Sequence, residues 1–328
     1  MHAAQLVAYG DPIKGLEYAT IPEPGKPGKD EALIGVEFSP INPNDLMVAE
    51  GIYAHKPTLP SVIGNEGVGS VLEVGENVRN VKKGDRVLLP LSGFVWRERM
   101  LVPAANLFAL PQNADPQQLA MLGINPPTAA LITSEFVDLK PGDWVIQNAA
   151  NSGVGRWVLA FAKERGFKTV NIVRRPELVS ELKELGADVV IVSSTSDLSG
   201  EVKDGTGGKD IRLGLDGISG AATGVIASQL GMHATLVVYA AMSESASSIN
   251  PLDLIFKSLW VKGFWMGHPE YAEKIPAAVK EAANMLASGK VKIPVASVYP
   301  LSEIKEAVAH ATRGGKVLLS INGSGSVN

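Results

Sequence analysis

The chain of 328 residues contains no cysteine. This absence excludes disulfide bonds, catalysis by a thiolate and every zinc site that uses a cysteine ligand. A metal ion would need histidine and carboxylate ligands alone, yet the sequence holds only five scattered histidines and no His-Glu-x-x-His spacing. We therefore predict that the protein binds no metal.

Long apolar runs and a strong excess of one charge are also missing. No stretch approaches the roughly 20 apolar residues that span a bilayer. The net charge of −4 and the pI near 5.8 give no reason to expect nucleic acid or an anionic membrane surface as a partner. Residues 1–9 show neither a signal peptide nor an Arg-rich transit peptide. We therefore expect a soluble, intracellular protein, located in the cytoplasm.

The hydrophobic pattern changes near residue 143 and predicts two kinds of domain. Up to about residue 110, short alternating segments such as 32–38 and 67–74 are separated by glycine and proline turns, which indicates a small β-barrel. From Asp143 onward, apolar strands alternate with helical patterns, which is typical of a parallel sheet covered on both faces. The six expected strands are 144–147, 169–173, 189–192, 213–215, 236–239 and 259–263. A last strand at 315–319 is expected to return to the first domain.

The first of these apolar strands is followed by a candidate phosphate-binding turn. It consists of Asn151, Ser152, Gly153, Val154 and Gly155 and leads into a helix. The glycines allow the backbone to approach a pyrophosphate, and the helix N-terminus directs free N–H groups and a positive dipole end at that charge. Because similar turns also close ordinary strand–helix junctions, the turn alone leaves both interpretations open.

Two arginines at the end of the second strand favour a particular dinucleotide. Arg174 lies 19 residues after Gly155 and Arg175 follows it, and no acidic residue stands at this strand end. An acidic residue there would accept from a ribose 2′-hydroxyl, whereas an arginine pairs with a 2′-phosphate. A solvated basic pair is the alternative, but the spacing favours NADPH.

The whole chain resembles the medium-chain dehydrogenase/reductase superfamily. The resemblance rests on the barrel segments 74–78 and 81–87, followed by a six-stranded nucleotide domain. It implies an α/β protein with a GroES-like β-barrel catalytic domain (residues 1–123 with 267–328) and a doubly wound Rossmann domain that binds the cofactor (residues 124–266). Zinc alcohol dehydrogenases of this superfamily carry a histidine ligand where this chain has Asn65 and use cysteines for the others, so the resemblance points to the zinc-free branch.

Within that branch the chain is similar to the enoyl thioester reductases, whose mitochondrial members serve fatty acid synthesis. The matching runs are 41–45, 51–53, 59–60, 64–67, 122–126, 145–155, 254–257 and 263–265. The resemblance implies that Tyr53 is the catalytic tyrosine and that Arg174 meets the 2′-phosphate. The further cofactor contacts it implies are Asn125, Asn151, Ser152, Gly153, Val154, Tyr239, Ala240, Ala241, Met242, Phe264, Trp265, Met266 and Lys316. Relatives place a second arginine two positions after the first, where this chain has Pro176, so the phosphate contacts are expected to differ.

The reaction expected from this resemblance is reduction of the α,β double bond of an enoyl thioester by NADPH. Negative charge then gathers on the carbonyl oxygen, which calls for a hydrogen-bond donor or a nearby acid, and a tyrosine hydroxyl can serve as either. Tyr53 could instead be a surface aromatic beside Pro57. Asn44 could orient Tyr53 or the nicotinamide, or only cap the short helix that follows Pro43.

Several alternatives stay open at this level. Trp265 could wall the substrate cleft or belong to the core, and Lys316 could touch the cofactor or face solvent. The rival activities are reduction of a free enone or quinone, and NADPH binding without turnover. The substrate is expected to be a CoA or acyl carrier protein thioester. Relatives pair their nucleotide domains, and the apolar edge strand at 259–261 would otherwise lie open, so a homodimer is expected.

Overall fold

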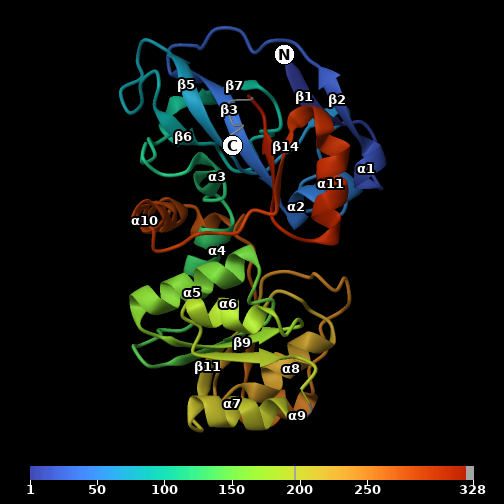
Figure 1. The fold of residues 1–328 in the computed structure, drawn as a ribbon, viewed down its shortest axis with the longest axis vertical. Coiled ribbons are helices and arrows are strands. Elements are labelled where there is room, and N and C mark those ends of the chain that lie inside the picture. Colours follow the sequence, from blue (N-terminus) through green and yellow to red (C-terminus); the bar gives the residue numbers. More distant parts are fainter. Residues whose placement is uncertain (196, 323–328) are drawn as a thin grey trace. The chain divides into compact units, whose positions relative to one another are not determined.

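The computed structural model describes residues 1–195 and 197–322, and it divides the chain into two compact units (Figure 1). Unit 1 comprises residues 1–124 and 279–328, and unit 2 comprises residues 125–278. The expected combination of an antiparallel β domain with a parallel α/β domain is confirmed.

Unit 1 is organised around one long strand, β3 (Glu31–Ile41). It pairs antiparallel with β5 (Val68–Val74), β7 (Arg99–Pro103) and β15 (Val317–Ser320). The last strand, β15, does return to the first part of the chain as expected, with Val317 opposite Ile41. A separate three-stranded sheet consists, in order, of β2 (Leu16–Thr20), β1 (His2–Leu6) and β4 (Ser61–Val62). The other strands of unit 1 are β6 (Arg86–Leu88) and β14 (Ser297–Pro300).

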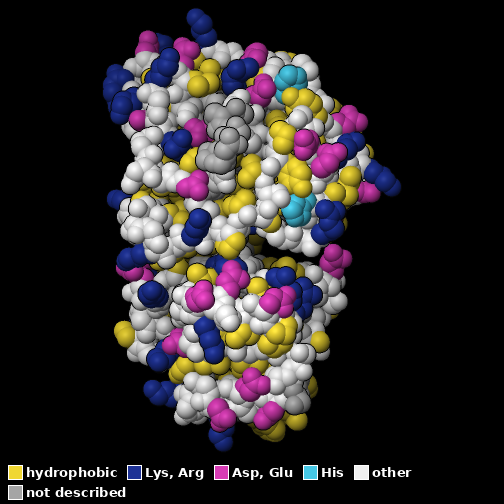
Figure 2. Space-filling view, in the orientation of Figure 1, with side chains coloured by type: hydrophobic (Ala, Val, Ile, Leu, Met, Phe, Trp, Pro, Cys, Tyr) yellow, Lys and Arg dark blue, Asp and Glu magenta, His cyan; other side chains and the backbone are white. Residues whose placement is uncertain are grey.

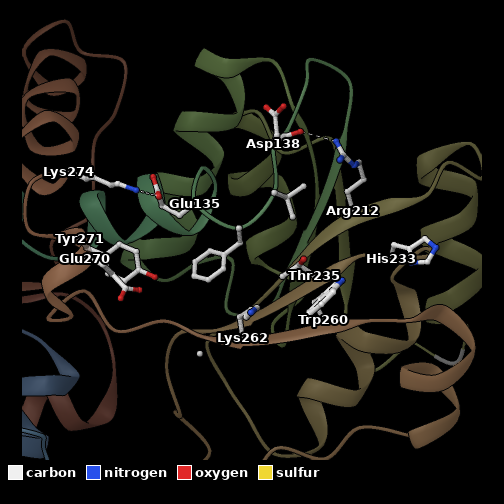
Figure 3. Close-up of a pocket in the computed structure, with 13 residues that line it drawn as sticks. Glu135, Asp138, Arg212, His233, Thr235, Trp260, Lys262, Glu270, Tyr271 and Lys274 are labelled. Atoms are coloured by element: carbon white, nitrogen blue, oxygen red, sulfur yellow. Dashed lines mark hydrogen bonds and ion pairs between the residues drawn. The ribbon is translucent and has the colours of Figure 1, made fainter.

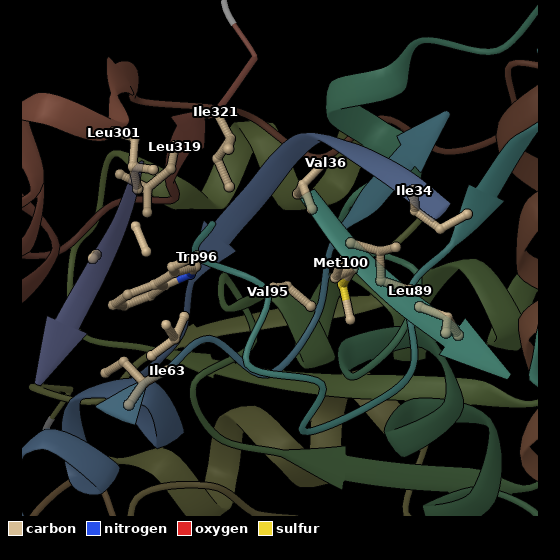
Figure 4. Packing of buried hydrophobic residues seen from close by; sticks show 14 of the residues in the cluster. Ile34, Val36, Ile63, Leu89, Val95, Trp96, Met100, Leu301, Leu319 and Ile321 are labelled. Atoms are coloured by element: carbon tan, nitrogen blue, oxygen red, sulfur yellow. The ribbon is translucent and has the colours of Figure 1, made fainter. Parts of the chain in front are cut away.

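The core of unit 1 gathers around the side chain of Trp96, which is fully buried (Figure 4). Its indole Nε1 donates to Ser39 Oγ at 2.9 Å, so the polar atom of this large side chain is satisfied. In Figure 4, Ile63 and Leu319 lie on either side of it, and they come from distant parts of the sequence. This core therefore ties the first hundred residues to the C-terminal strand.

Helix α2 (Pro43–Glu50) carries the segment that leads to Tyr53. Pro43 occupies its first turn, and Asn42 is the N-cap residue, with the Asn42 amide donating to Asp45 Oδ2 at 2.8 Å. Gly51 ends the helix with φ of 78°, a left-handed conformation that glycine adopts without strain. The remaining helical elements of unit 1 are α1 (Pro12–Gly15), η1 (Ala104–Asn106), α3 (Pro116–Leu119), η3 (Leu301–Glu303) and α11 (Ile304–Arg313); α10 (Ile275–Ala287) crosses the boundary between the units.

Unit 2 contains a six-stranded parallel sheet with the order β10-β9-β8-β11-β12-β13. All six strands expected from the apolar segments are present. They are β8 (Trp144–Gln147), β9 (Lys168–Val173), β10 (Val189–Val192), β11 (Ile211–Asp216), β12 (Thr235–Val238) and β13 (Trp260–Gly263). The strand order reverses between β8 and β11, and ligands of such sheets bind at the carboxyl ends of the strands beside this reversal.

Helices cover both faces of this sheet, as the continuous apolar strands predict (Figure 1). On one face, α5 (Gly153–Arg165) and α6 (Leu178–Glu184) contribute Leu159 and Leu182. On the other, α7 (Leu198–Thr206) and α8 (Ala221–Gln229) contribute Val202 and Ile226. The other helical elements of unit 2 are α4 (Asn125–Ile132), α9 (Pro251–Lys257) and η2 (Pro269–Tyr271).

The surface carries mixed charge. Figure 2 shows Lys and Arg side chains interspersed with Asp and Glu on the visible face. Over the described residues, no helix is both long and apolar enough to cross a membrane.

Candidate active site

The predicted phosphate-binding turn has the expected local structure. Ser152 is the N-cap of α5, and its Oγ accepts from the Gly155 amide at 3.1 Å. The amides of Gly153 and Val154 stand in the first turn, where a helix provides no acceptor, so they are available to an anion. A side chain at Gly155 would have its Cβ 2.5 Å from the Ala150 carbonyl oxygen. The tight turn therefore requires glycine at this position.

Asn125 lies directly against this turn. A Cβ placed on Gly153 would lie 2.8 Å from Asn125 Nδ2, so the absence of a side chain makes room for the asparagine. Asn125 is the first residue of α4, and it is far from the turn in sequence. The structure thus brings together two groups that the sequence connected only through the family resemblance.

Tyr239 places a buried polar atom beside the same turn. Its hydroxyl makes no hydrogen bond of normal geometry within the described residues, although it neighbours Ser152 and Asp216. A Cβ on Gly217 would lie 2.6 Å from it. Burial, followed by the negative charge of Asp216, raises the pKa of Tyr239 well above its usual range, so the hydroxyl remains a donor. A buried donor whose hydrogen bonding is incomplete fits a site that a nucleotide completes.

Arg174 and Arg175 follow the end of β9, and both side chains are exposed. Arg175 pairs with Glu177 at 3.7 Å, whereas Arg174 has no ion pair within the described part of the chain. β9 is the neighbour of β8, whose carboxyl end leads into the glycine turn. Arg174 is therefore the freer of the two cations to meet a phosphate.

The remaining predicted cofactor residues of unit 2 follow the carboxyl ends of β12 and β13. Ala240, Ala241 and Met242 are partly or fully exposed after β12. The ring of Phe264 packs 4.9 Å from that of Tyr271, so its side chain belongs to the core. Trp265 is 42% exposed, which excludes the alternative of a core residue, and Met266 lies beside Thr128.

The two predicted catalytic residues belong to unit 1. Tyr53 is half-buried and packs against the core of that unit, and its amide donates to Met47 O at 3.2 Å. Asn44 lies inside the first turn of α2. The suggestion that Asn44 caps this helix is wrong, because Asn42 occupies the N-cap position and engages Asp45.

Sequence reasoning missed a buried polar cluster at the start of α2. Asp45 is fully buried, and its Oδ1 accepts from both the amide and the Nδ2 of Asn65, at 2.9 and 2.8 Å. Lys316 Nζ donates to Asn42 Oδ1 at 2.6 Å. The alternative in which Lys316 only faces solvent is therefore wrong, while its contact with the cofactor stays a prediction. The Asn42-x-x-Asp45 spacing of a capping box was the one available signal.

A buried arginine at the glycine turn was also missed. Arg156 follows the turn in α5, and its Nε donates to Asn151 O at 3.1 Å. Its other end pairs with Glu181 of α6 at 2.7 Å. Arg156 therefore links the turn to the helix that follows the two arginines.

The burial of Asp45 leads to a prediction about pH. Burial, together with the negative charge of Glu66, raises the pKa of Asp45 to about 7. The folded protein then binds a proton that the unfolded chain releases near pH 4, so the contribution of Asp45 to the free energy of unfolding should fall as pH rises between about 4 and about 7. For one proton the slope is at most about 1.4 kcal/mol per pH unit.

Asp45→Asn should reduce this dependence, because the amide does not titrate. Urea unfolding across that pH window measures the slope. The exposed Asp138→Asn is the matched control and should keep the parental slope. If Asp45→Asn also keeps it, Asp45 does not titrate in this window.

A hollow of about 810 Å³ lies elsewhere in unit 2 (Figure 3). It is lined by Arg212 of β11, Thr235 of β12 and Trp260 of β13, which stand near the amino ends of these strands. Lys274 and Glu135 form an ion pair at one end of it. None of the glycine-turn residues lines this hollow, so we do not assign it to the cofactor.

Comparison with known proteins agrees with this geometry. Residues 28–112 match the family model described as alcohol dehydrogenase GroES-like domain, and residues 153–287 match that described as zinc-binding dehydrogenase. Together the fold and these matches define a medium-chain dehydrogenase/reductase.

A more specific relationship follows from comparison with whole proteins. The mitochondrial enoyl-[acyl-carrier-protein] reductase of Caenorhabditis elegans is 38% identical over 293 residues, which cover 87% of this chain and 84% of the relative. The chain belongs to the enoyl-[acyl-carrier-protein] reductase family.

Two solved structures are similar to the chain along nearly its whole length. The Etr1p/NADP/crotonyl-CoA complex has a TM-score of 0.89 at 26% identity and covers 97% of this chain and 99% of its own. The Escherichia coli quinone oxidoreductase complexed with NADPH has a TM-score of 0.86 at 26% identity and covers 98% and 100%.

The zinc in the description of one matched family does not fit the residues of this chain. Among the described residues, no group of three or more His, Cys, Asp or Glu side chains could hold a metal. The side-chain amide of Asn65 donates to Asp45, and both oxygens of Glu66 accept hydrogen bonds, so these side chains are engaged within the protein.

Proposed function

We propose that this protein reduces the α,β double bond of an enoyl thioester, carried on CoA or acyl carrier protein, with NADPH as the reductant. The observation that carries the proposal is the buried Tyr239 hydroxyl, which lies beside Ser152 of a turn that requires glycine at Gly155. The family relationship and the crotonyl-CoA complex of a similar protein support the choice of substrate. The proposed catalytic domain comprises residues 1–123 and 267–328, and the proposed cofactor domain residues 124–266.

The residues of unit 2 would hold the cofactor along its length. The amides of Gly153 and Val154 and the positive end of α5 suit the pyrophosphate, and Arg174 suits the 2′-phosphate. The other proposed cofactor contacts are Asn151, Ser152, Gly155, Arg175 and the segments 239–242 and 264–266. Bound NADPH supplies the hydride, which adds to the β-carbon of the substrate.

Tyr53 is proposed to act on the thioester oxygen or the α-carbon of the substrate. As negative charge develops on the thioester oxygen, the hydroxyl either donates a hydrogen bond to it or delivers the proton to the α-carbon. Asn44, on the adjacent helix α2, is proposed to orient Tyr53 or the nicotinamide. Lys316 is proposed to reach the cofactor while it remains bonded to Asn42.

A panel of substrates tests the proposed function. With NADPH in excess, we expect turnover of crotonyl-CoA to exceed that of a simple enone and of a quinone. Preference for the quinone would instead support the activity named for the E. coli neighbour. Tight NADPH binding without turnover of any of the three would indicate a binding protein.

We also propose a homodimer formed through the edge strand β13. All four residues of β13 are exposed, and Trp260 is 60% exposed. The neighbouring helix α9 has no buried residue and exposes Ile255 and Phe256 by 64% and 69%. An open apolar edge of this kind is expected to be covered by a second chain.

Trp260→Lys should convert the dimer into a monomer, because a charge on an edge strand opposes pairing. Light scattering over a range of concentrations measures the molar mass. Val7→Lys places the same charge on an exposed valine of unit 1 and should leave the dimer intact. A parental protein that is monomeric at every concentration refutes the proposal.

The compartment remains a separate prediction. The C. elegans relative is named mitochondrial. We propose a cytoplasmic location for this chain, which cell fractionation tests.

A further inference from the structure

Glu66 is a buried acidic residue whose carboxylate accepts hydrogen bonds from two consecutive backbone amides. Its side chain has no exposed surface. Oε2 accepts from the amide of Gly123 at 2.8 Å and from that of Ile124 at 3.0 Å. A Cβ on Gly123 would lie 3.1 Å from the Glu66 Cβ, so this backbone packs directly on the side chain. These two residues are the last of unit 1 before the chain enters unit 2 at Asn125.

The second carboxylate oxygen of Glu66 is connected to a cation through one amide side chain. Oε1 accepts from Asn42 Nδ2 at 2.7 Å, and Asn42 Oδ1 accepts from Lys316 Nζ at 2.6 Å. An amide between a carboxylate and an ammonium group satisfies both in only one orientation. Asn42 therefore fixes the direction of this chain of hydrogen bonds.

The same asparagine joins Glu66 to the helix that precedes Tyr53. The backbone amide of Asn42 donates to Asp45. Asp45 also accepts from the backbone amide of Asn65, the neighbour of Glu66. Burial raises the pKa values of both carboxyl groups, and the positive charge of Lys316 opposes this change. Buried ionic clusters contribute little net stability compared with apolar packing. We therefore interpret the cluster as a means of fixing the positions of its residues, and not as a source of stability.

We propose that Glu66 is a positioning residue for the reduction, and that it acts by fixing the backbone at Gly123 and Ile124 immediately before Asn125. This inference rests on the proposed function, because Asn125 is a proposed cofactor contact beside the nucleotide turn of unit 2. Asn125 is the residue that packs on Gly153 of that turn. A displacement of about 1 Å between reacting groups can cost about 10²-fold in rate.

The geometry suggests two substitutions. Glu66→Gln breaks a hydrogen bond of the cluster, and Asn42→Asp restores it in the double variant. In Glu66→Gln, the new amide must turn its oxygen to the two backbone amides, so its NH₂ group faces the NH₂ group of Asn42. Rotating Asn42 would only move the conflict to Lys316. Adding Asn42→Asp supplies a carboxylate that accepts from both the new amide and Lys316. The double variant keeps every hydrogen bond and the net charge of the cluster.

Steady-state kinetics and binding test the proposal. Glu66→Gln should lower kcat by about 10²-fold, and the double variant Asn42→Asp/Glu66→Gln should recover at least about tenfold of that loss. Binding of 2′,5′-ADP, a probe of the Arg174 end of the cofactor site, should change by less than about twofold in either variant. A kcat for Glu66→Gln within about threefold of the parent, or a double variant no faster than the single, overturns the proposal.

Hydrogen exchange provides a measurement that does not depend on turnover. The amides of Gly123 and Ile124 should lose protection in Glu66→Gln and regain it in the double variant. Unchanged protection in Glu66→Gln overturns the inference whatever the substrate. If protection follows the expected pattern while the parent reduces no enoyl thioester, the proposed function fails and the hold of Glu66 on this backbone stands.

Discussion

Tyr53→Phe should lower kcat for an enoyl thioester by about 10²- to 10⁴-fold, the range for loss of a general acid or of a donor to a developing oxyanion. The ring is retained, and it packs against the core of unit 1. The dissociation constant of NADPH should therefore stay unchanged. Steady-state kinetics with crotonyl-CoA, together with fluorescence titration of NADPH, separates the two effects.

The same variant distinguishes the two roles of the hydroxyl. If Tyr53 donates only to the oxygen, protonation at the α-carbon in D₂O keeps its stereochemistry, whereas a direct acid would lose that stereospecificity. Tyr18→Phe removes a hydroxyl from an exposed tyrosine of the same unit and should leave kcat unchanged. An unchanged kcat in Tyr53→Phe would remove this residue from the mechanism.

Arg174→Ala should weaken NADPH binding by roughly 10- to 10²-fold and leave NADH binding nearly unchanged. A hydrogen bond to a charged group is worth about 1.5 to 3 kcal/mol, and only NADPH carries the 2′-phosphate. Isothermal titration with both cofactors measures the difference.

Arg175→Ala is the matched control for this experiment. Arg175 is paired with Glu177 at 3.7 Å, so its loss should cost NADPH binding less than the loss of Arg174. If the parental protein binds NADH as tightly as NADPH, the interpretation of both arginines is wrong.

Local sequence patterns were sufficient to predict the parallel sheet. The six apolar segments are strands because a strand covered on both faces needs a continuous apolar run. Ser152 and Gly166 mark the two ends of α5, and Gly166 has φ of 80° there. Such signals are local, since the cap and the left-handed residue act on the helix beside them.

The cluster around Glu66 could not be predicted in the same way. Its members, Asn42, Asp45, Glu66 and Lys316, are separated by up to 274 residues. Only the antiparallel pairing of β15 with β3 brings Lys316 next to Asn42. No periodicity or turn signal reports such a long-range pairing, and the family resemblance suggested a role for Lys316 without naming its partners.

The most direct test of the proposed reaction is to follow the transferred hydrogen. With NADPH deuterated at the transferred position of the nicotinamide and crotonyl-CoA as substrate, mass spectrometry and NMR locate the label in the product. The account predicts butyryl-CoA with one deuterium on the β-carbon and a hydrogen from solvent on the α-carbon. Deuterium at the carbonyl carbon, or NADPH oxidation without any label in the acyl chain, would contradict it.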